Sequence, residues 1–142
     1  PAIGSALLNT SDIVSCKNFK KLWAVLSMDY VDDVDLVVTW NESTDVAGGT
    51  TSAITTACPI WYNIDTATAD LLTRATDGIT FTINTGAGKN QLWIMEWDPA
   101  KFTAGYDCFQ IRMSGAGASI VDVLYIAEPR YQSDVNVAAI TD

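Results

Sequence analysis

The sequence predicts an all-β fold: an antiparallel two-sheet β-sandwich of jelly-roll type with at most one short helix. Two observations support this prediction. Short runs alternate apolar with polar residues, the period that a sheet with one solvated face requires. Turn-forming Gly, Ala, Thr and Asn residues separate these runs at short intervals. The clearest runs are Phe81–Asn84, Gln91–Trp97, Phe109–Met113 and Ile120–Ile126.

The N-terminal half predicts at least two further strands. Lys21–Met28 and Asp35–Trp40 are rich in β-branched and aromatic residues, and an acidic break separates them. Asn41–Ser52 contains paired glycines and is expected to be a loop. The following run, Ile54–Ile64, contains Pro59, which cannot donate to a strand ladder. We therefore expect this run at a sheet edge or a bulge.

The C-terminal half gives a more regular pattern. Asp65–Arg74 allows a short helix, because its first residue is a good N-cap and two leucines follow. From Ile79 onward we expect a run of antiparallel strand pairs. Gly86–Gly88 is interpreted as a hairpin turn and Gly115–Gly117 as a second turn, with a helical turn at Asp98–Phe102 between them.

Length and composition predict one domain, residues 1–142, with extended arms at 1–18 and 135–142. Hydrophobic residues make up 49% of the chain and charged residues 18%, so we expect another subunit to cover part of the apolar surface. The formal charge of −9 disfavours nucleic acid and anionic membranes as partners. No apolar run reaches the roughly 18–20 residues of a membrane span, and the first residues lack a basic signal-peptide region. Synthesis in the cytosol is the expectation.

The numbers of histidines and cysteines limit the catalytic and metal-binding chemistry that the chain can carry. Histidine is absent, which removes the usual general base and the Ser-His-Asp and Cys-His nucleophile pairs. The three cysteines, Cys16, Cys58 and Cys108, are widely spaced and form no CxxC pair. Neither a disulfide framework nor a zinc site is indicated, and buried free thiols are expected. We predict no catalytic residues, no cofactor and no metal.

Three acidic or glycine-rich patterns have ordinary structural explanations. The Gly86–Gly88 turn lacks the first glycine and the Ser/Thr of a phosphate-binding loop. Glu96 and Asp98 lie two residues apart and could share a strand face at a spacing compatible with glycoside hydrolysis, although a solvated strand end is favoured. An acidic cluster could bind calcium through oxygen ligands, or simply protect a sheet edge. Its members are Asp29, Asp32, Asp33 and Asp35.

Five tryptophans are many for this length. Trp93 and Trp97 share a strand face with Met95, so core packing is expected for most of the five, with one or two left for an interface. Trp61 and its neighbour are the best candidates for exposure, because they follow a proline near a loop. The candidate interface residues are Pro59, Trp61, Tyr62 and Tyr131.

The segment Leu71–Gln132 resembles the decoration, or cement, proteins encoded among the head genes of tailed bacteriophages. The resemblance lies in the order of features: Gly78–Ile83, Leu92–Asp98 running into Pro99–Phe102, Gly105–Ile111, a glycine-rich turn and a closing strand that ends at Tyr131. It implies a sandwich that sits on the outer surface of a capsid and stabilises the shell without enzymatic activity.

The same resemblance implies the partner and the location. The partner would be the major capsid protein lattice, and the protein itself would be a homo-oligomer, with a trimer favoured. It would be made in the host cytoplasm and located on the capsid surface of the virion. The terminal arms are where contacts that add strands to neighbouring subunits are expected.

Two other classes of function stay open. A carbohydrate-binding module would share the jelly roll and should expose two or three coplanar aromatic rings beside polar side chains. An enzyme would need the Glu96 and Asp98 pair, or the aspartate cluster, to lie in a deep pocket. A sandwich fold by itself does not decide between these classes.

Overall fold

The computed structural model describes residues 2–3, 10–31, 34–84, 86–115 and 119–130, and within them it is built of β-strands. The elements are β1 (Ala2–Ile3), β2 (Val14–Ser15), β3 (Phe19–Tyr30), β4 (Leu36–Ser43), β5 (Thr51–Ala53), β6 (Ile60–Asn63), β7 (Thr73–Arg74), β8 (Thr80–Ile83), β9 (Lys89–Trp97), the 3-10 turn η1 (Pro99–Lys101), β10 (Cys108–Ser114) and β11 (Ile120–Pro129). The predicted all-β class is confirmed.

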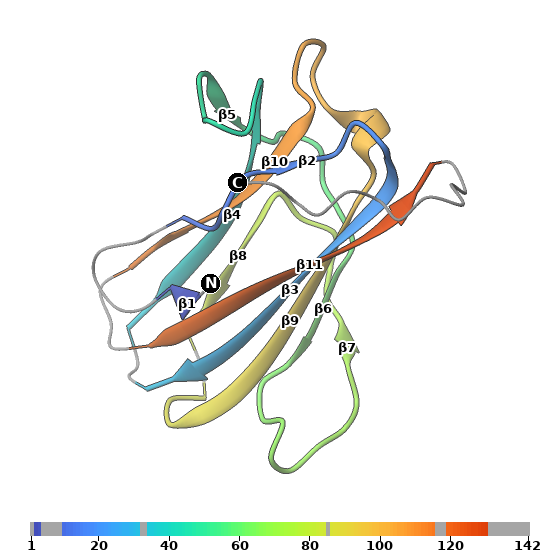
Figure 1. Ribbon diagram of the computed structural model, residues 1–142. Coiled ribbons are helices and arrows are strands. Elements are labelled where there is room, and N and C mark those ends of the chain that lie inside the picture. The colour runs from blue at the N-terminus through green and yellow to red at the C-terminus, as the bar shows by residue number, and fades with distance from the viewer. Residues whose placement is uncertain (1, 4–9, 32–33, 85, 116–118, 131–142) are drawn as a thin grey trace.

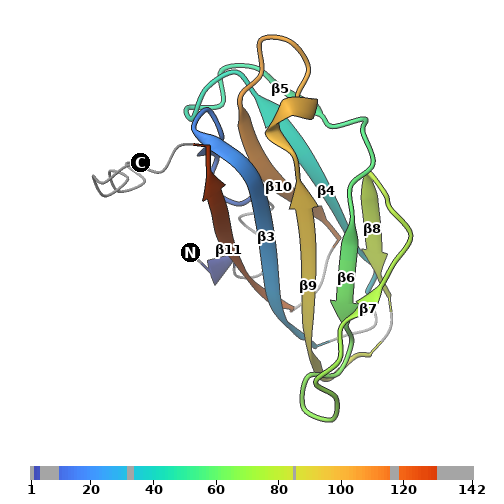
Figure 2. The same ribbon diagram turned by 90° about the vertical axis from the view of Figure 1, so that its right-hand side faces the viewer.

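The strands form two antiparallel sheets that pack face to face (Figures 1 and 2). Sheet A has the order β1-β11-β3-β9-β6-β7, and sheet B has the order β2-β10-β4-β5, with β8 also pairing with β4. The order β1-β11-β3-β9 opposite β2-β10-β4-β8 is that of a jelly roll, in which the chain alternates between sheets. The β6–β7 hairpin widens sheet A at one edge.

The prediction that the strands after Ile79 pair with their neighbours in sequence is wrong. The Gly86–Gly88 turn exists, with the Lys89 N–H donating to the Gly86 carbonyl at 3.1 Å. It is not a hairpin turn, because it joins β8 in sheet B to β9 in sheet A. The connection from β10 to β11 also changes sheet. Alternation along a strand reports which face is buried, whereas the pairing partner is set by contacts distant in sequence.

The two predicted helical segments have different outcomes. The turn at Asp98–Phe102 is confirmed as η1, with Asp98 Oδ1 accepting from the Ala100 N–H at 2.9 Å. The short helix at Asp65–Arg74 is wrong, because the segment makes a single turn and then enters β7. Asn63 Nδ2 donates to the Ala69 carbonyl at 2.6 Å, and this contact closes the turn on itself.

Aromatic side chains join the two sheets in the core. The Trp93 ring lies between Phe81 of sheet B, at 4.4 Å between centroids, and Tyr62 of sheet A, at 4.9 Å. At the C-terminal end of β9, the ring centroids of Trp97 and Phe109 lie 6.2 Å apart. Burial of these rings supplies much of the hydrophobic stabilisation, about 25 cal/mol for each Å² of apolar surface. The three cysteines are free and buried, as expected.

The expected arms divide between described and undescribed residues. Within residues 1–18, β1 pairs with β11 and β2 pairs with β10 of the same chain. Ser11 is buried, and its backbone N–H donates to the Ile111 carbonyl at 2.9 Å. The later part of this segment, from residue 10, is therefore part of the sandwich. Residues 135–142 lie outside the described residues.

Candidate functional site

The outward face of sheet A is the most unusual surface of the sandwich, because its central strands carry apolar side chains on both faces. In β3, Leu22, Ala24 and Leu26 point into the core, while Trp23 and Val25 point outward and are half-buried. Strand β9 repeats the pattern, with outward side chains that are half-buried. In Figure 2 no described segment lies over β3 and β9 midway along their length.

The strand register joins these side chains into a continuous patch, which we name the outer band. One row runs across four strands, since Leu124 pairs with Val25, Val25 with Ile94, and Ile94 with Trp61. A second row places Ile126 opposite Trp23. The members of the outer band are Trp23, Val25, Trp61, Leu92, Ile94, Leu124 and Ile126.

The outer band is most accessible at β11. Leu124 is 60% exposed and Ile126 is 49% exposed. Single exposed apolar side chains are normal on soluble proteins, but a contiguous patch bordered by polar groups marks a contact surface for another molecule. The band therefore has the character of an interaction surface.

A polar cluster borders the outer band at Trp23. Glu96 accepts hydrogen bonds from Lys21 Nζ at 2.8 Å and from Trp23 Nε1 at 3.0 Å. The hydrogen bond from Lys21 is the main cause of a lowered pKa for the Glu96 carboxyl, and the bond from Trp23 acts in the same direction. The pKa of Lys21 is raised by the same hydrogen bond. The cluster holds the Trp23 ring in a fixed orientation on the sheet face.

A second polar contact fixes Trp61. The Arg74 guanidinium lies 4.6 Å from the centroid of the Trp61 ring, a cation–π contact. Arg74 Nη1 also donates to the Ile60 carbonyl at 3.2 Å and to the Ala75 carbonyl at 3.0 Å, and Nη2 pairs with Asp77. The guanidinium therefore covers one face of the indole and is held there.

The predicted interface residues separate in the structure. Trp61 belongs to the outer band, and Pro59 lies half-buried just before β6, its carbonyl accepting from the Glu96 N–H at 3.1 Å. Tyr62 points the other way and stacks on Trp93 in the core, because successive strand residues face opposite sides. Tyr131 lies outside the described residues.

Sequence reasoning missed the other members of the outer band. The signal was present in Leu22–Leu26 and Leu92–Met95, where apolar residues occupy successive positions. A near-continuous apolar run in a strand indicates that both faces are covered. With only one core available to a single sandwich, the second apolar face remains at the surface of the described structure.

The described residues place the acidic candidates in ordinary structural positions. Glu96 is ion-paired on the outer face, and its lowered pKa is opposite to the raised pKa that a general acid needs. Asp98 caps η1. Asp29 and Asp35 are exposed, while residues 32–33 fall outside the described ranges. In the described part of the chain, no group of three or more Cys, Asp or Glu side chains could hold a metal ion.

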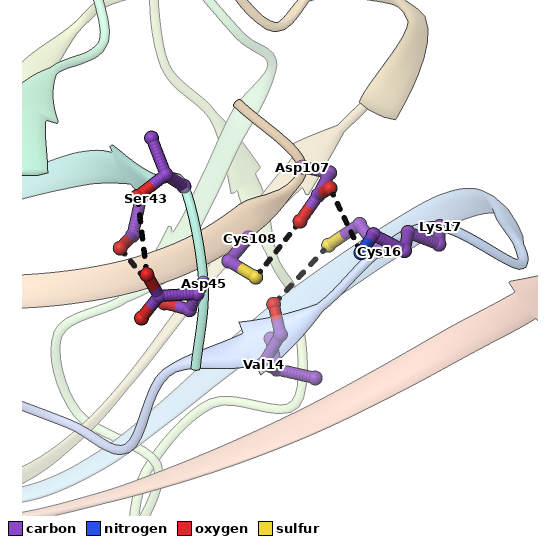
Figure 3. A network of polar contacts seen from close by, with 8 residues as sticks. Val14, Cys16, Lys17, Ser43, Asp45, Asp107 and Cys108 are labelled. Carbon is purple, nitrogen blue, oxygen red and sulfur yellow. Dashed lines mark hydrogen bonds and ion pairs between the residues drawn. The ribbon is translucent and has the colours of Figure 1, made fainter. Parts of the chain in front are cut away.

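A polar network near the end of sheet B involves two of the cysteines (Figure 3). The Cys16 N–H donates to the Asp107 carbonyl at 2.8 Å, and Cys108 Sγ donates to Asp107 Oδ1 at 3.1 Å. Lys17 Nζ pairs with Asp107 Oδ2 at 3.2 Å. Burial is the main cause that raises the pKa of each of the two thiols to about 12. Both therefore stay protonated near neutral pH, and the network ties β2 to β10.

In the described part of the chain, no helix is long and apolar enough to cross a membrane. No known protein family, curated protein or solved structure matches this chain.

Proposed function

We propose that this protein is a non-enzymatic structural component of a virion, a decoration protein that binds the outer surface of a tailed-phage capsid and stabilises the shell. The observation that supports the proposal is the outer band, an apolar sheet face on a rigid jelly roll. The resemblance of Leu71–Gln132 to cement proteins points in the same direction. The proposed partner is the major capsid protein lattice.

The physical requirements of the role match the outer band. A cement protein needs a stiff scaffold and an apolar contact area, and it needs no active site. Many copies engage one fixed lattice, so modest individual contacts add up to a durable shell. We further propose a homo-oligomer, with a trimer favoured, that is made in the host cytoplasm and located on the virion surface. The net charge of −9 disfavours nucleic acid and anionic membranes as partners.

The proposal is tested by co-sedimentation of the purified chain with phage heads that lack it. Ile126→Asp places a carboxylate in the outer band, and a contact that buries this charge should weaken at least about tenfold. Val46→Asp is the matched control, since Val46 is 51% exposed and lies in the loop between β4 and β5. We expect the wild-type chain and the Val46 variant to sediment with heads and the Ile126 variant to stay in solution. Equal binding by all three would contradict the proposal.

A carbohydrate-binding module is the second candidate, favoured by the two indoles on one sheet face. Trp23 on β3 and Trp61 on β6 flank β9 and lie beside Glu96 and Arg74. Sugar rings stack on aromatic faces at a protein surface, and both indoles are half-buried on this sheet face. Glycan-array binding that disappears on Trp61→Ala, together with no binding to heads, would favour this function over capsid decoration.

A further inference from the structure

Among the described residues, strand β11 is paired along only part of one of its two edges. On one side it pairs with β3 along its whole length, from Ile120 to Pro129. On the other side β1 pairs with it only at Val121 and Asp122. Among the described residues, no strand pairs with the outer edge of β11 beyond Asp122. The backbone there can accept a further strand.

This edge also lacks the features that protect exposed strands. Proteins protect sheet edges with charged side chains, proline or bulges. Val123–Ala127 contains none of these, and the bulge of β11 occurs only at Glu128 and Pro129. The adjoining side chains include Leu124 and Ile126, the most exposed members of the outer band. The free edge and the apolar patch therefore coincide.

A segment of suitable length begins where β11 ends. Residues 131–142 lie outside the described residues and number twelve, enough to span about 40 Å when extended. Strand β11, with ten residues, is about 33 Å long. Within the segment, Val135, Asn136 and Val137 alternate apolar and polar residues as a strand with one buried face requires.

The start of this segment directs it away from its own strand. The Arg130 N–H donates to the Asn18 carbonyl at 2.8 Å, and Arg130 Nε donates to the Phe19 carbonyl at 2.9 Å, so Arg130 itself lies alongside the start of β3. A tight hairpin would need Gly or Asn in the next positions. Residues 131–134 are Tyr-Gln-Ser-Asp, so the sequence does not favour a return along the same β11.

We propose that residues 134–140 of one copy add as a strand to the free edge of β11 in a neighbouring copy. Val135 and Val137 face outward beside Leu124 and Ile126 and so widen the outer band. The core-facing side of the β11 edge is less suitable for the two valines. Tyr125 lies on that side, and its hydroxyl is already paired with Ser11. This inference rests on the assembly role proposed above and names the contact between copies.

Disulfide trapping between two single variants tests the proposal. One preparation carries Ile126→Cys and the other Val137→Cys, and they are mixed with oxidised glutathione. The control partner is Asn136→Cys, which points to the opposite side of the added strand. We expect at least tenfold more mixed covalent dimer with Val137→Cys than with Asn136→Cys. The proposal is overturned if Val137→Cys and Asn136→Cys give equal amounts of mixed covalent dimer with Ile126→Cys, or if neither gives any.

The native thiols do not interfere with this measurement, because all three are buried and free. The trapping uses no phage heads, so its failure and the failure of the decoration role are separate results. A chain ending at Arg130 provides a second readout. Light scattering should show that it associates at least tenfold more weakly than the full chain, and unchanged association would also overturn the proposal.

Discussion

Gly115 directly follows β10 and has a backbone conformation that favours glycine. Its φ is 143°, and a Cβ at this position would lie 2.4 Å from the Asp35 carbonyl oxygen, which is backbone and cannot move aside cheaply. We expect Gly115→Ala to destabilise the fold by about 3 kcal/mol through backbone strain and overlap. Gly88→Ala is the matched variant, with φ 74° and no atom within 4 Å of the added Cβ, and should cost about 1 kcal/mol. Urea unfolding measures both, and equal losses would contradict this account.

Glu96 makes the stability of the fold depend on pH. Its folded pKa lies below the unfolded value of 4.5, so the ionised carboxylate adds stability that is present above pH 4.5 and lost as pH falls through the folded pKa. Glu96→Gln keeps an acceptor for Trp23 but removes the charge beside Lys21. At pH 7 the variant should melt about 2 °C below the wild type. The difference should shrink as the pH falls below 4.5 and the Glu96 carboxylate is protonated.

A charge-removal control comes from the same face. Asp122 is exposed and makes no ion pair within the described residues. Asp122→Asn should melt with the wild type at both pH 7 and pH 3. A Glu96→Gln difference that persists undiminished at pH 3 would mean that the ion pair with Lys21 is not its cause.

Burial of the three cysteine thiols predicts that they react slowly with thiol reagents. Burial is the first cause that raises the pKa of Cys16, Cys58 and Cys108 to about 12, from a usual value of 9.0. Since the thiolate is the reactive form, labelling with a disulfide reagent at pH 8 should be about a thousandfold slower in the folded protein than in urea. Prompt labelling of any of the three in the folded state would contradict their described burial.

At the scale of elements, Tyr125 connects β11 to the segment before β2. Its hydroxyl pairs with the Ser11 hydroxyl and accepts from the Ile111 N–H at 3.3 Å. Tyr125→Phe should cost about 1–2 kcal/mol in urea unfolding, because these contacts lose a buried partner. Tyr62→Phe is the control: its ring stacks on Trp93, but its hydroxyl makes no hydrogen bond in the described residues, so it should cost under about 0.5 kcal/mol. Equal losses would remove the role given to the Tyr125 hydroxyl.

The strands themselves could be predicted from sequence, but their partners could not. Alternation identified the strands from Phe81 onward, because burial of one face imposes a period of two. The strand beginning near Lys21 was identified by its β-branched and aromatic residues. Sequence could not show that β8 pairs with β4, with residues 44–79 between the two strands, since pairing depends on non-local contacts. The glycines of Gly86–Gly88 marked a turn correctly but not the sheets that the turn joins.

The candidate site was predictable only in part. Trp61 was expected at the surface because it follows a proline near a loop, and it lies in the outer band. Tyr62 was expected beside it, but adjacent strand residues point to opposite faces, so its ring is in the core. Leu124 and Ile126 could not be distinguished from core residues by hydrophobicity alone, because their exposure depends on what covers sheet A.

At the scale of the whole molecule, the sandwich has more apolar surface than its own core can bury. One face of sheet A packs on sheet B, and the other carries the outer band. The hydrophobic fraction of 49% reflects both faces, and the net charge of −9 adds a repulsion that any contact between copies must overcome. A partner that covers the band would remove apolar surface from water and gain the corresponding free energy.

The most direct test of this account is a cryo-EM reconstruction of phage heads with the chain bound. The account predicts that the outward face of sheet A lies against the capsid, with Leu124 and Ile126 buried in the contact. A reconstruction in which the chain is seated through another face, with these two side chains in solvent, would contradict it.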